Sequence, residues 1–389
     1  MADAWPAVGA APQRWVHRDP MASRRRRQRD TGCFHSAVVP RIAGRIPDLS
    51  PALQEEAGRA TADLTRFDAG STTLDALPFA AVLLRGESAS SSQIENLTVR
   101  ARKLSLAALG AKIGGNAELV ARNVAAMQAA LAASENLDAD ALRTMHRELT
   151  TGVQHDTGVF REEWVWIGGS SPVTAAYVAP AWEEVPVAVE DLVAFCARRD
   201  LNPLVRAAIA HAQFETIHPF TDGNGRTGRA LVSALLRADG TLGSVTVPLS
   251  SGLLHVADEY IAALTAYRQG APEPIVRCFV DAAYSSMANA RLLIEDIRAF
   301  HGKILASRPR VTQGLQAVAR LCAAEPAFTA AMVEDLTGVS RATAYRIIDG
   351  LTEQGLLIRE RIKIAGRTVW SAPELLQGLD RFAERAIRG

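Results

Sequence analysis

One twelve-residue segment, residues 218–229, constrains the fold of this chain more than any other. Its sequence is His-Pro-Phe-Thr-Asp-Gly-Asn-Gly-Arg-Thr-Gly-Arg. No helix breaker precedes it back to Pro203, and apolar residues recur at helical spacing after it, from Ala230 onward. Gly223 and Gly225 lack a Cβ, so they tolerate positive φ and let the backbone come close to a ligand. The sequence therefore predicts two helices joined by a tight turn that carries polar side chains.

The side chains of this turn are those that phosphate chemistry requires. The helix after the turn begins with free N–H groups and the positive end of its dipole, which favour an anion. Arg226 and Arg229 lie three residues apart on that helix and can make bidentate contacts to phosphate. Asp222 can bind Mg²⁺, which usually takes one or two carboxylates together with phosphate oxygens. A histidine titrates near neutral pH, so His218 can accept a proton from a hydroxyl.

The segment resembles the signature of the Fic family, HPFxDGNGRxxR, and matches it at every fixed position. Fic proteins mostly transfer AMP from ATP onto a Ser, Thr or Tyr hydroxyl of a target protein. The resemblance implies that His218 is the general base, that Asp222 is the Mg²⁺ ligand and that Phe220 is buried. The residues that it implies for ATP binding are Gly223, Asn224, Gly225, Arg226, Thr227, Gly228 and Arg229. The first three would form an anion hole around the α- and β-phosphates, and the two arginines would clamp the β- and γ-phosphates.

Other nucleotide and metal sites fit the sequence less well. It contains neither a G-x-x-x-x-G-K-[ST] loop nor the kinase motifs VAIK, HRD and DFG. His211, Glu215 and His218 share one helical face and could be a metal triad, but their spacing is not H-E-x-x-H. We expect His211 and Glu215 to brace the loop by hydrogen bonds instead, and we assign no zinc.

Composition restricts the class of protein. The net charge is +1, which argues neither for nor against nucleic acid, and no apolar stretch approaches the roughly 20 residues of a spanning helix. The four cysteines have no C-x-x-C spacing, which favours a reducing cytoplasm. Because no spanning stretch is present, we expect no membrane partner. We expect residues 1–33 to be a disordered leader, in which the basic cluster Arg24–Arg27 with Arg29 is solvated or touches nucleic acid.

The expected fold is mostly α-helical. Helical patterns occur at 51–67, 73–85, 91–109, 116–132, 138–149 and 274–305. We divide the chain into an amino-terminal helical region (34–135), a Fic core (136–305) and a carboxy-terminal module (310–389).

A β-hairpin is predicted within 158–183, where Val165, Trp166 and Ile167 precede a Gly-Gly pair and a second apolar pair. Its position matches the flap of the Fic fold, which pairs with an extended segment of the target by strand addition. An ordinary hairpin that caps the core fits the same residues. Farther along, Tyr260 either lines the adenine pocket or faces the core.

The segment from Ser91 to Asn96 fits a second Fic-family pattern, [S/T]-x-x-x-E-[G/N], which marks an inhibitory helix. In this pattern Ser91, Glu95 and Asn96 occupy the fixed positions. The resemblance implies that the Glu95 carboxylate pairs with Arg229 and occupies the space that the γ-phosphate needs. ATP would then bind with its phosphates misaligned for attack.

The carboxy-terminal module resembles a winged helix-turn-helix, with Ser340 as the expected N-cap of its second helix. Its basic residues, which could contact DNA phosphates, are Arg341, Arg346, Arg359, Arg361, Lys363 and Arg367. Its acidic residues nearly balance them: Glu334, Asp335, Asp349, Glu353 and Glu360. Winged helices also form protein and dimer contacts, which we favour slightly.

The sequence is thus interpreted as an autoinhibited protein adenylyltransferase that uses ATP and Mg²⁺. It modifies a target protein, and we also consider self-modification and a homodimer. One alternative keeps the fold and reverses the reaction, with Glu95 aligning a water that removes AMP from the target. Another is a DNA-binding regulator in which the Fic core senses a nucleotide.

Overall fold

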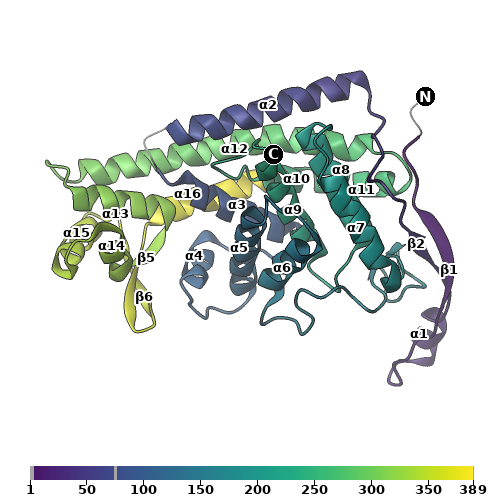
Figure 1. The fold of residues 1–389 in the computed structure, drawn as a ribbon. Helices are drawn as coiled ribbons and strands as arrows, with labels where there is room; N and C mark the ends of the chain where they lie inside the picture. Colours follow the sequence, from purple (N-terminus) through teal and green to yellow (C-terminus); the bar gives the residue numbers. More distant parts are fainter. Residues whose placement is uncertain (1–3, 74–76, 389) are drawn as a thin grey trace. The chain divides into compact units, whose positions relative to one another are not determined.

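The computed structural model describes residues 4–73 and 77–388, and helices dominate these residues (Figure 1). Two compact units are formed. The first contains Met1–Thr61, Ala126–Asp239 and Asp258–Val280, and the second contains Ala62–Ala125, Gly240–Ala257 and Asp281–Gly389. Four of the described helices have residues in both units: α2 (Pro51–Thr73), α5 (Asn116–Ala132), α11 (Ala257–Arg268) and α12 (Glu273–Ala306). No helix within the described residues is both long enough and apolar enough to cross a membrane.

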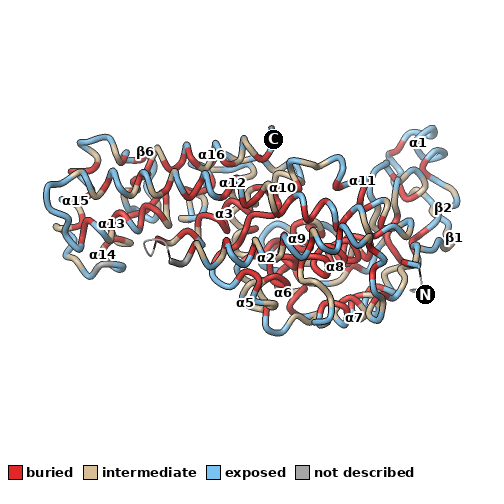
Figure 2. Tube along the Cα trace, turned by 90° about the horizontal axis from the view of Figure 1, so that it is seen from above, coloured by how far each residue is buried: buried red, intermediate tan, exposed pale blue. Residues whose placement is uncertain are grey.

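The core of the first unit is built around helix α8 (Pro203–Ile217). It packs against α7 (Val185–Cys196) and α9 (Asn224–Ala238), and α6 (Ala139–Thr150) packs against α9. Figure 2 shows α8 as buried along nearly its whole length, because its residues after Pro203 are all buried. The helix begins where the Asn202 side chain accepts hydrogen bonds from Leu204 N and Val205 N. The helices predicted on both sides of the 218–229 turn are therefore confirmed.

The amino terminus differs from the expected disordered leader. Strand β1 (Gly9–Trp15) pairs antiparallel with β2 (Gly32–Val38), and the short helix α1 (Arg24–Arg29) lies between them. Aromatic contacts hold this amino-terminal segment to the rest of the first unit: Phe34 packs edge-on against Trp164, and Trp5 packs against Tyr267. The abundance of arginine suggested disorder, whereas a few buried aromatic rings determine the observed structure.

The β-hairpin predicted within 158–183 is confirmed in this unit. Strand β3 (Trp166–Ile167) pairs antiparallel with β4 (Tyr177–Val178), and the short 3-10 helix η1 (Trp182–Glu184) follows. Gly169 has a φ of 70°, and a Cβ there would lie 2.4 Å from the Thr174 carbonyl oxygen. The turn therefore requires glycine at this position. Helix α11 (Ala257–Arg268) also belongs to this unit, except for its first residue.

Two helices of the second unit have different bounds from those predicted. A single helix, α3 (Phe79–Ile94), replaces the end of 73–85 and the start of 91–109, and α4 (Ala101–Ala108) is separate. Residues 74–76 lie outside the described residues. Tertiary contacts keep α3 continuous through its polar middle, because Glu87 accepts hydrogen bonds from both the backbone N and the hydroxyl of Ser250. The other neighbours of α3 in this unit are α10 (Leu249–His255), α13 (Gln313–Ala324) and α16 (Pro373–Arg388).

The carboxy-terminal module has the predicted order of helix, turn, helix and hairpin. After α13 come β5 (Ala327–Thr329), α14 (Ala330–Thr337), α15 (Arg341–Glu353), β6 (Ile358–Ile364) and β7 (Arg367–Ser371). The strands form one antiparallel sheet in the order β5-β7-β6. Ser340 is the N-cap of α15, as predicted, because its hydroxyl accepts a hydrogen bond from Thr343 N.

Candidate functional site

The turn between α8 and α9 contains two residues with left-handed backbone conformations. His218 has a φ of 51° and ends α8, where its N–H donates to the Phe214 carbonyl oxygen at 2.8 Å. Gly223 has a φ of 77° and is the N-cap residue of α9. Histidine adopts this conformation more readily than most residues, and glycine adopts it freely. The chain thus leaves one helix and enters the next within a few residues, with His218 at the point of reversal.

Asn224 closes the loop with its side chain. The Phe220 N–H donates to Asn224 Oδ1 at 3.0 Å, and Asn224 Nδ2 donates to the Phe220 carbonyl oxygen at 2.9 Å. Asn224 was expected in the anion hole, but here its side-chain amide is engaged by the loop itself. Only its backbone N–H, in the first turn of α9, is oriented by the helix for an anion.

Phe220 anchors the loop in the core, as expected. Its side chain is fully buried, and its ring stacks on the His146 ring with centroids 3.8 Å apart and planes 2° apart. Phe160 also packs against it, at 5.5 Å between centroids. The loop is therefore held by aromatic packing as well as by hydrogen bonds.

His146, on α6, is a site residue that the sequence interpretation missed. Its Nδ1 accepts a hydrogen bond from Gly158 N at 2.9 Å, so its Nε2 carries the proton and donates to the Asp222 carbonyl oxygen at 3.0 Å. Burial lowers the pKa of His146, which keeps the ring neutral in this role. No sequence motif marks this histidine, because its partners lie far along the chain.

Arg161 is a second residue that was missed. Its Nε donates to the His218 carbonyl oxygen at 2.8 Å, and its backbone N donates to the Pro219 carbonyl oxygen at 3.0 Å. Its Nη2 donates to the Pro180 carbonyl oxygen at 2.7 Å, at the far end of the flap. Burial lowers the pKa of Arg161 to about 10. One buried guanidinium therefore joins the flap to the 218–229 loop.

The ring of His218 is positioned by Glu215. Its Nδ1 lies 3.3 Å from the Glu215 carbonyl oxygen and 3.7 Å from the Glu215 carboxylate. The side chain is 15% exposed, so solvent and substrate can reach it. A proton on Nδ1 satisfies the carbonyl and makes Nε2 the basic nitrogen.

The charged residues of the turn gather at the start of α9. Asp222 projects outward with 69% of its side chain exposed, accepts a hydrogen bond from Gln154 Nε2 at 3.0 Å and lies 3.6 Å from Arg226 Nη2. Arg226 and Arg229 are buried in the first turns of α9. A single exposed carboxylate suits Mg²⁺, which keeps several waters and takes its other ligands from phosphate. Among the described residues, no group of three or more His, Cys, Asp or Glu side chains could hold a metal by itself.

His211 supports α9 from beneath. Its Nε2 lies 2.7 Å from the Tyr260 hydroxyl, and a Cβ added at Gly228 would lie 3.0 Å from its Nδ1. Burial lowers the pKa of His211 to about 3, and the charge of Arg229 acts in the same direction. Of the two roles considered for Tyr260, which is 3% exposed, these contacts favour the core-facing one. A contact between Tyr260 and the nucleotide base stays a prediction.

The remaining predicted residues lie in two places. In the flap, Trp166 and Ile167 form β3, and Val165 accepts a backbone hydrogen bond from Ala179 at 3.0 Å. In the second unit, Ser91 is buried in the last turns of α3, and Glu95 is the exposed residue that ends this helix. Asn96 follows with a φ of 60°. The predicted inhibitory segment therefore ends a helix, and the pairing of Glu95 with Arg229 stays a prediction.

Comparison with known proteins identifies the family. Residues 136–236, which include α8, the loop and most of α9, match the Fic/DOC family. Residues 136–236 of the chain therefore belong to the Fic/DOC family.

Its curated relatives support this membership over part of the chain. The chain is 30% identical over 144 residues to "Protein adenylyltransferase fic-1" of Caenorhabditis elegans, covering 37% of this chain and 26% of that protein. It is 32% identical over 112 residues to "Protein adenylyltransferase Fic" of Nematostella vectensis, covering 28% and 24%. The matched stretch thus spans about a quarter of each relative. A crystal structure of a Fic family protein from Desulfovibrio desulfuricans G20 shares the fold, with a TM-score of 0.51, 23% identity, and coverage of 84% of this chain and 97% of that one.

Proposed function

We propose that this Fic protein transfers AMP from ATP to a Ser, Thr or Tyr hydroxyl of a target protein. One observation carries the proposal: the turn brings a partly exposed histidine, an exposed carboxylate and two buried arginines to the start of a single helix. These are the kinds of group that phosphoryl chemistry uses, because positioning and charge stabilisation supply most of its rate.

The reaction follows from the position of each group. The target hydroxyl oxygen attacks the α-phosphorus of ATP while its proton passes to Nε2 of His218. The bond from the α-phosphorus to the bridging oxygen breaks, and pyrophosphate leaves. Arg226 and Arg229, buried and fixed on α9, would hold the outer phosphates. Asp222 would hold Mg²⁺, which when bound neutralises charge on the phosphate oxygens.

The proposal is tested by separating ATP binding from transfer. His218→Ala should lose label transfer from ATP to a lysate protein or to the chain itself by about 10²–10⁴-fold. It should still bind ATP, because the phosphate contacts lie on other residues. His155→Ala removes an exposed histidine nearby and serves as the matched control. A transfer rate for His218→Ala within a few-fold of the control would overturn the assignment.

We further propose that the flap binds the target by strand addition. Its strands are short, and Ile167 is 39% exposed, so an extended segment could pair with the backbone there. Arg161 links this hairpin to the carbonyl group of His218, which would keep the docked hydroxyl in register with the base.

Regulation by Glu95 is a proposal that rests on the family pattern. Glu95→Gly should raise label transfer well above the wild-type level if this carboxylate restrains the enzyme. If wild type instead removes AMP from a modified target and Glu95→Gly loses that activity, the reverse reaction is the correct function.

The wing favours a second candidate function, DNA binding. Glu360, the acid that appeared to balance the wing, is buried, pairs with Arg102 and accepts a hydrogen bond from the Ser371 hydroxyl. The exposed charges of the β6–β7 hairpin are therefore basic: Arg359, Arg361, Lys363 and Arg367. A salt-dependent gel shift that is lost on replacing Arg361 and Lys363 by Glu would support this function. Unchanged shifts would exclude the wing as its source.

A further inference from the structure

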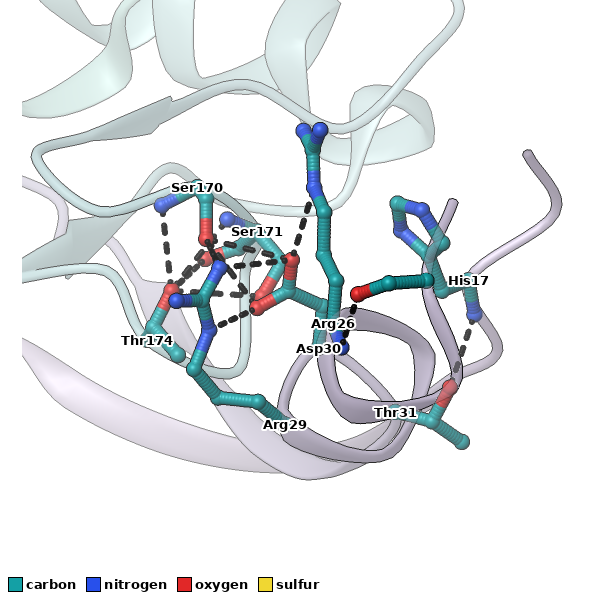
Figure 3. A network of polar contacts seen from close by, with 9 residues as sticks. His17, Arg26, Arg29, Asp30, Thr31, Ser170, Ser171 and Thr174 are labelled. Carbon is teal, nitrogen blue, oxygen red and sulfur yellow. Dashed lines mark hydrogen bonds and ion pairs between the residues drawn. The ribbon is translucent and has the colours of Figure 1, made fainter. Parts of the chain in front are cut away.

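The tip of the amino-terminal hairpin is fastened to the tip of the flap by one buried carboxylate (Figure 3). Asp30 is fully buried and pairs with Arg29 at 2.8 Å and with Arg26 at 3.6 Å. The Ser170 hydroxyl in the flap turn donates to the same carboxylate at 3.0 Å, and Arg29 Nη2 donates to the Ser170 oxygen at 2.9 Å. The anchor therefore joins α1 to the flap.

Aromatic packing continues this contact along the two hairpins. Trp15 of β1 lies edge-on to Trp166 of β3, with ring centroids 6.0 Å apart, and β2 lies against β4. The Ser170 and Ser171 N–H groups both donate to the Thr174 hydroxyl, which fixes the flap turn that receives the anchor. The amino-terminal hairpin and the flap thus form one surface, in contrast to a mobile leader beside a separate hairpin.

The anchor leaves an excess of positive charge on this surface. Asp19 and Asp30 are the only acidic residues between Arg14 and Arg45, and Asp30 already forms ion pairs with Arg26 and Arg29. The other three arginines of α1, namely Arg24, Arg25 and Arg27, are exposed. None of them has an ion pair with any of the residues that the structure describes. We call these three arginines the α1 cluster.

We propose that the α1 cluster is a docking surface for an acidic segment of the target protein, close in sequence to the hydroxyl that is modified. This inference rests on the proposed function, because the flap is the strand to which the target adds. An extended segment on the flap advances about 3.3 Å per residue, so residues just beyond the flap turn would reach α1. Backbone pairing accepts many sequences, and the α1 cluster adds a charge requirement that selects among them.

A protein segment fits the location better than a nucleic acid. The cluster spans only about one turn of a six-residue helix, and the Asp30 anchor fastens this helix to the flap turn. A duplex needs several phosphate contacts spread along a groove, whereas a short acidic peptide needs few contacts. Exposed pairs of this kind contribute selectivity and association rate, and they weaken with salt.

Binding of defined peptides tests the proposal without requiring catalysis. The probes are two fluorescein-labelled peptides of equal length around a central Thr, one flanked by Glu and the other by Gln. The test protein is the full chain with Arg24→Glu, Arg25→Glu and Arg27→Glu. The matched control carries the same charge change at three exposed cations of the second unit, Lys103→Glu, Lys112→Glu and Arg320→Glu.

The wild type and the control should bind the Glu peptide more tightly than the Gln peptide, with an affinity that falls from 0.05 to 0.5 M salt. The α1 triple variant should lose roughly 3- to 100-fold in affinity for the Glu peptide only, because each of the three exposed ion pairs contributes roughly 1.5- to 5-fold. A second variant guards against misfolding of the charge-reversed protein and should lose less affinity for the Glu peptide. It carries Arg24→Gln, Arg25→Gln and Arg27→Gln.

Several outcomes would overturn the docking surface. One is equal binding of the two peptides by the wild type, and another is an equal loss in the α1 variant and the control. Displacement of the Glu peptide by a DNA duplex at lower concentration than by unlabelled peptide would assign the cluster to nucleic acid. A different result would refute the proposed function and leave the docking surface intact. In that result, wild type and Glu95→Gly both transfer no label, while the Glu peptide still binds.

Discussion

His146 offers the clearest test of how the catalytic loop is held. Replacing it with Phe keeps an aromatic ring against Phe220 but removes both hydrogen bonds, whereas His146→Ala removes the ring as well. The Gly158 N–H is buried, so losing its acceptor should cost about 1–3 kcal/mol. The Asp222 carbonyl is only partly buried and water can replace its donor, so that loss should cost about 1 kcal/mol.

We therefore expect His146→Phe to lower the free energy of unfolding by about 2–4 kcal/mol. His146→Ala should lower it further, because the Phe220 ring loses its stacked neighbour 3.8 Å away and a cavity remains. Transfer of AMP should fall about 10- to 100-fold in His146→Phe even when the protein is folded, because a shift of about 1 Å in the loop misplaces the base.

Urea denaturation followed by circular dichroism gives the first quantity, and label transfer from ATP at a temperature where each variant is folded gives the second. His155→Phe and His155→Ala are the controls, since this histidine is exposed on the segment that leads into the loop. If His146→Phe were as stable and as active as His155→Phe, the hydrogen bonds of His146 would have no role in holding the loop.

Three further perturbations probe buried charges. The pKa of His211 is about 3 in the folded protein, below its unfolded value of about 6.5. The buried neutral ring therefore destabilises nothing above pH 6.5, and the free energy of unfolding falls as the pH drops from 6.5 toward 3. Urea unfolding at pH 7 and pH 5 should show a loss of about 2 kcal/mol in wild type that is missing in His211→Gln, and equal losses would contradict the shift. Arg229→Ala should not gain the activity expected of Glu95→Gly, since Arg229 also aligns ATP; equal label transfer by the two variants would limit Arg229 to inhibition. For Asp30, the Arg29 guanidinium lowers the carboxyl pKa to about 2, so the flap anchor should persist above pH 4 and weaken as pH falls through 2. Faster amide exchange at Ser170–Thr174 in Asp30→Asn than in wild type at pH 7 checks this, and identical exchange would argue against the anchor.

Local sequence was sufficient for the elements that neighbouring residues determine. Asn202 and Pro203 begin α8, a pair of glycines turns the flap, and Ser340 caps α15, and each of these features acts within a few residues. The loop was predictable for the same reason, because its glycines, its histidine and its arginines lie within twelve residues. The predicted turn between two helices and the observed turn therefore agree.

The braces of the loop were not predictable, because they depend on contacts between distant residues. His146 reaches Asp222 across 76 positions, and Arg161 reaches the His218 carbonyl across 57. The break predicted between 85 and 91 failed similarly, since α3 continues through Gly86, which packs against the Phe382 ring. A sequence pattern shows which residues prefer a helix end, and packing against remote residues decides whether the helix ends there.

The braces explain why the loop can hold a strained residue at its centre. A non-glycine residue in the left-handed region costs on the order of 1 kcal/mol or more, and His218 occupies that region. The backbone around it is held by Arg161 on one side and by the side chain of Asn224 on the other, and each supplies two buried or partly buried hydrogen bonds. At roughly 1 kcal/mol apiece these bonds exceed the strain, so the reversed conformation is stable without a nucleotide. Under the proposed function, a base and two arginines that are already in place would need little reorganisation on ATP binding, and such preorganisation is a main source of charge stabilisation in a transition state.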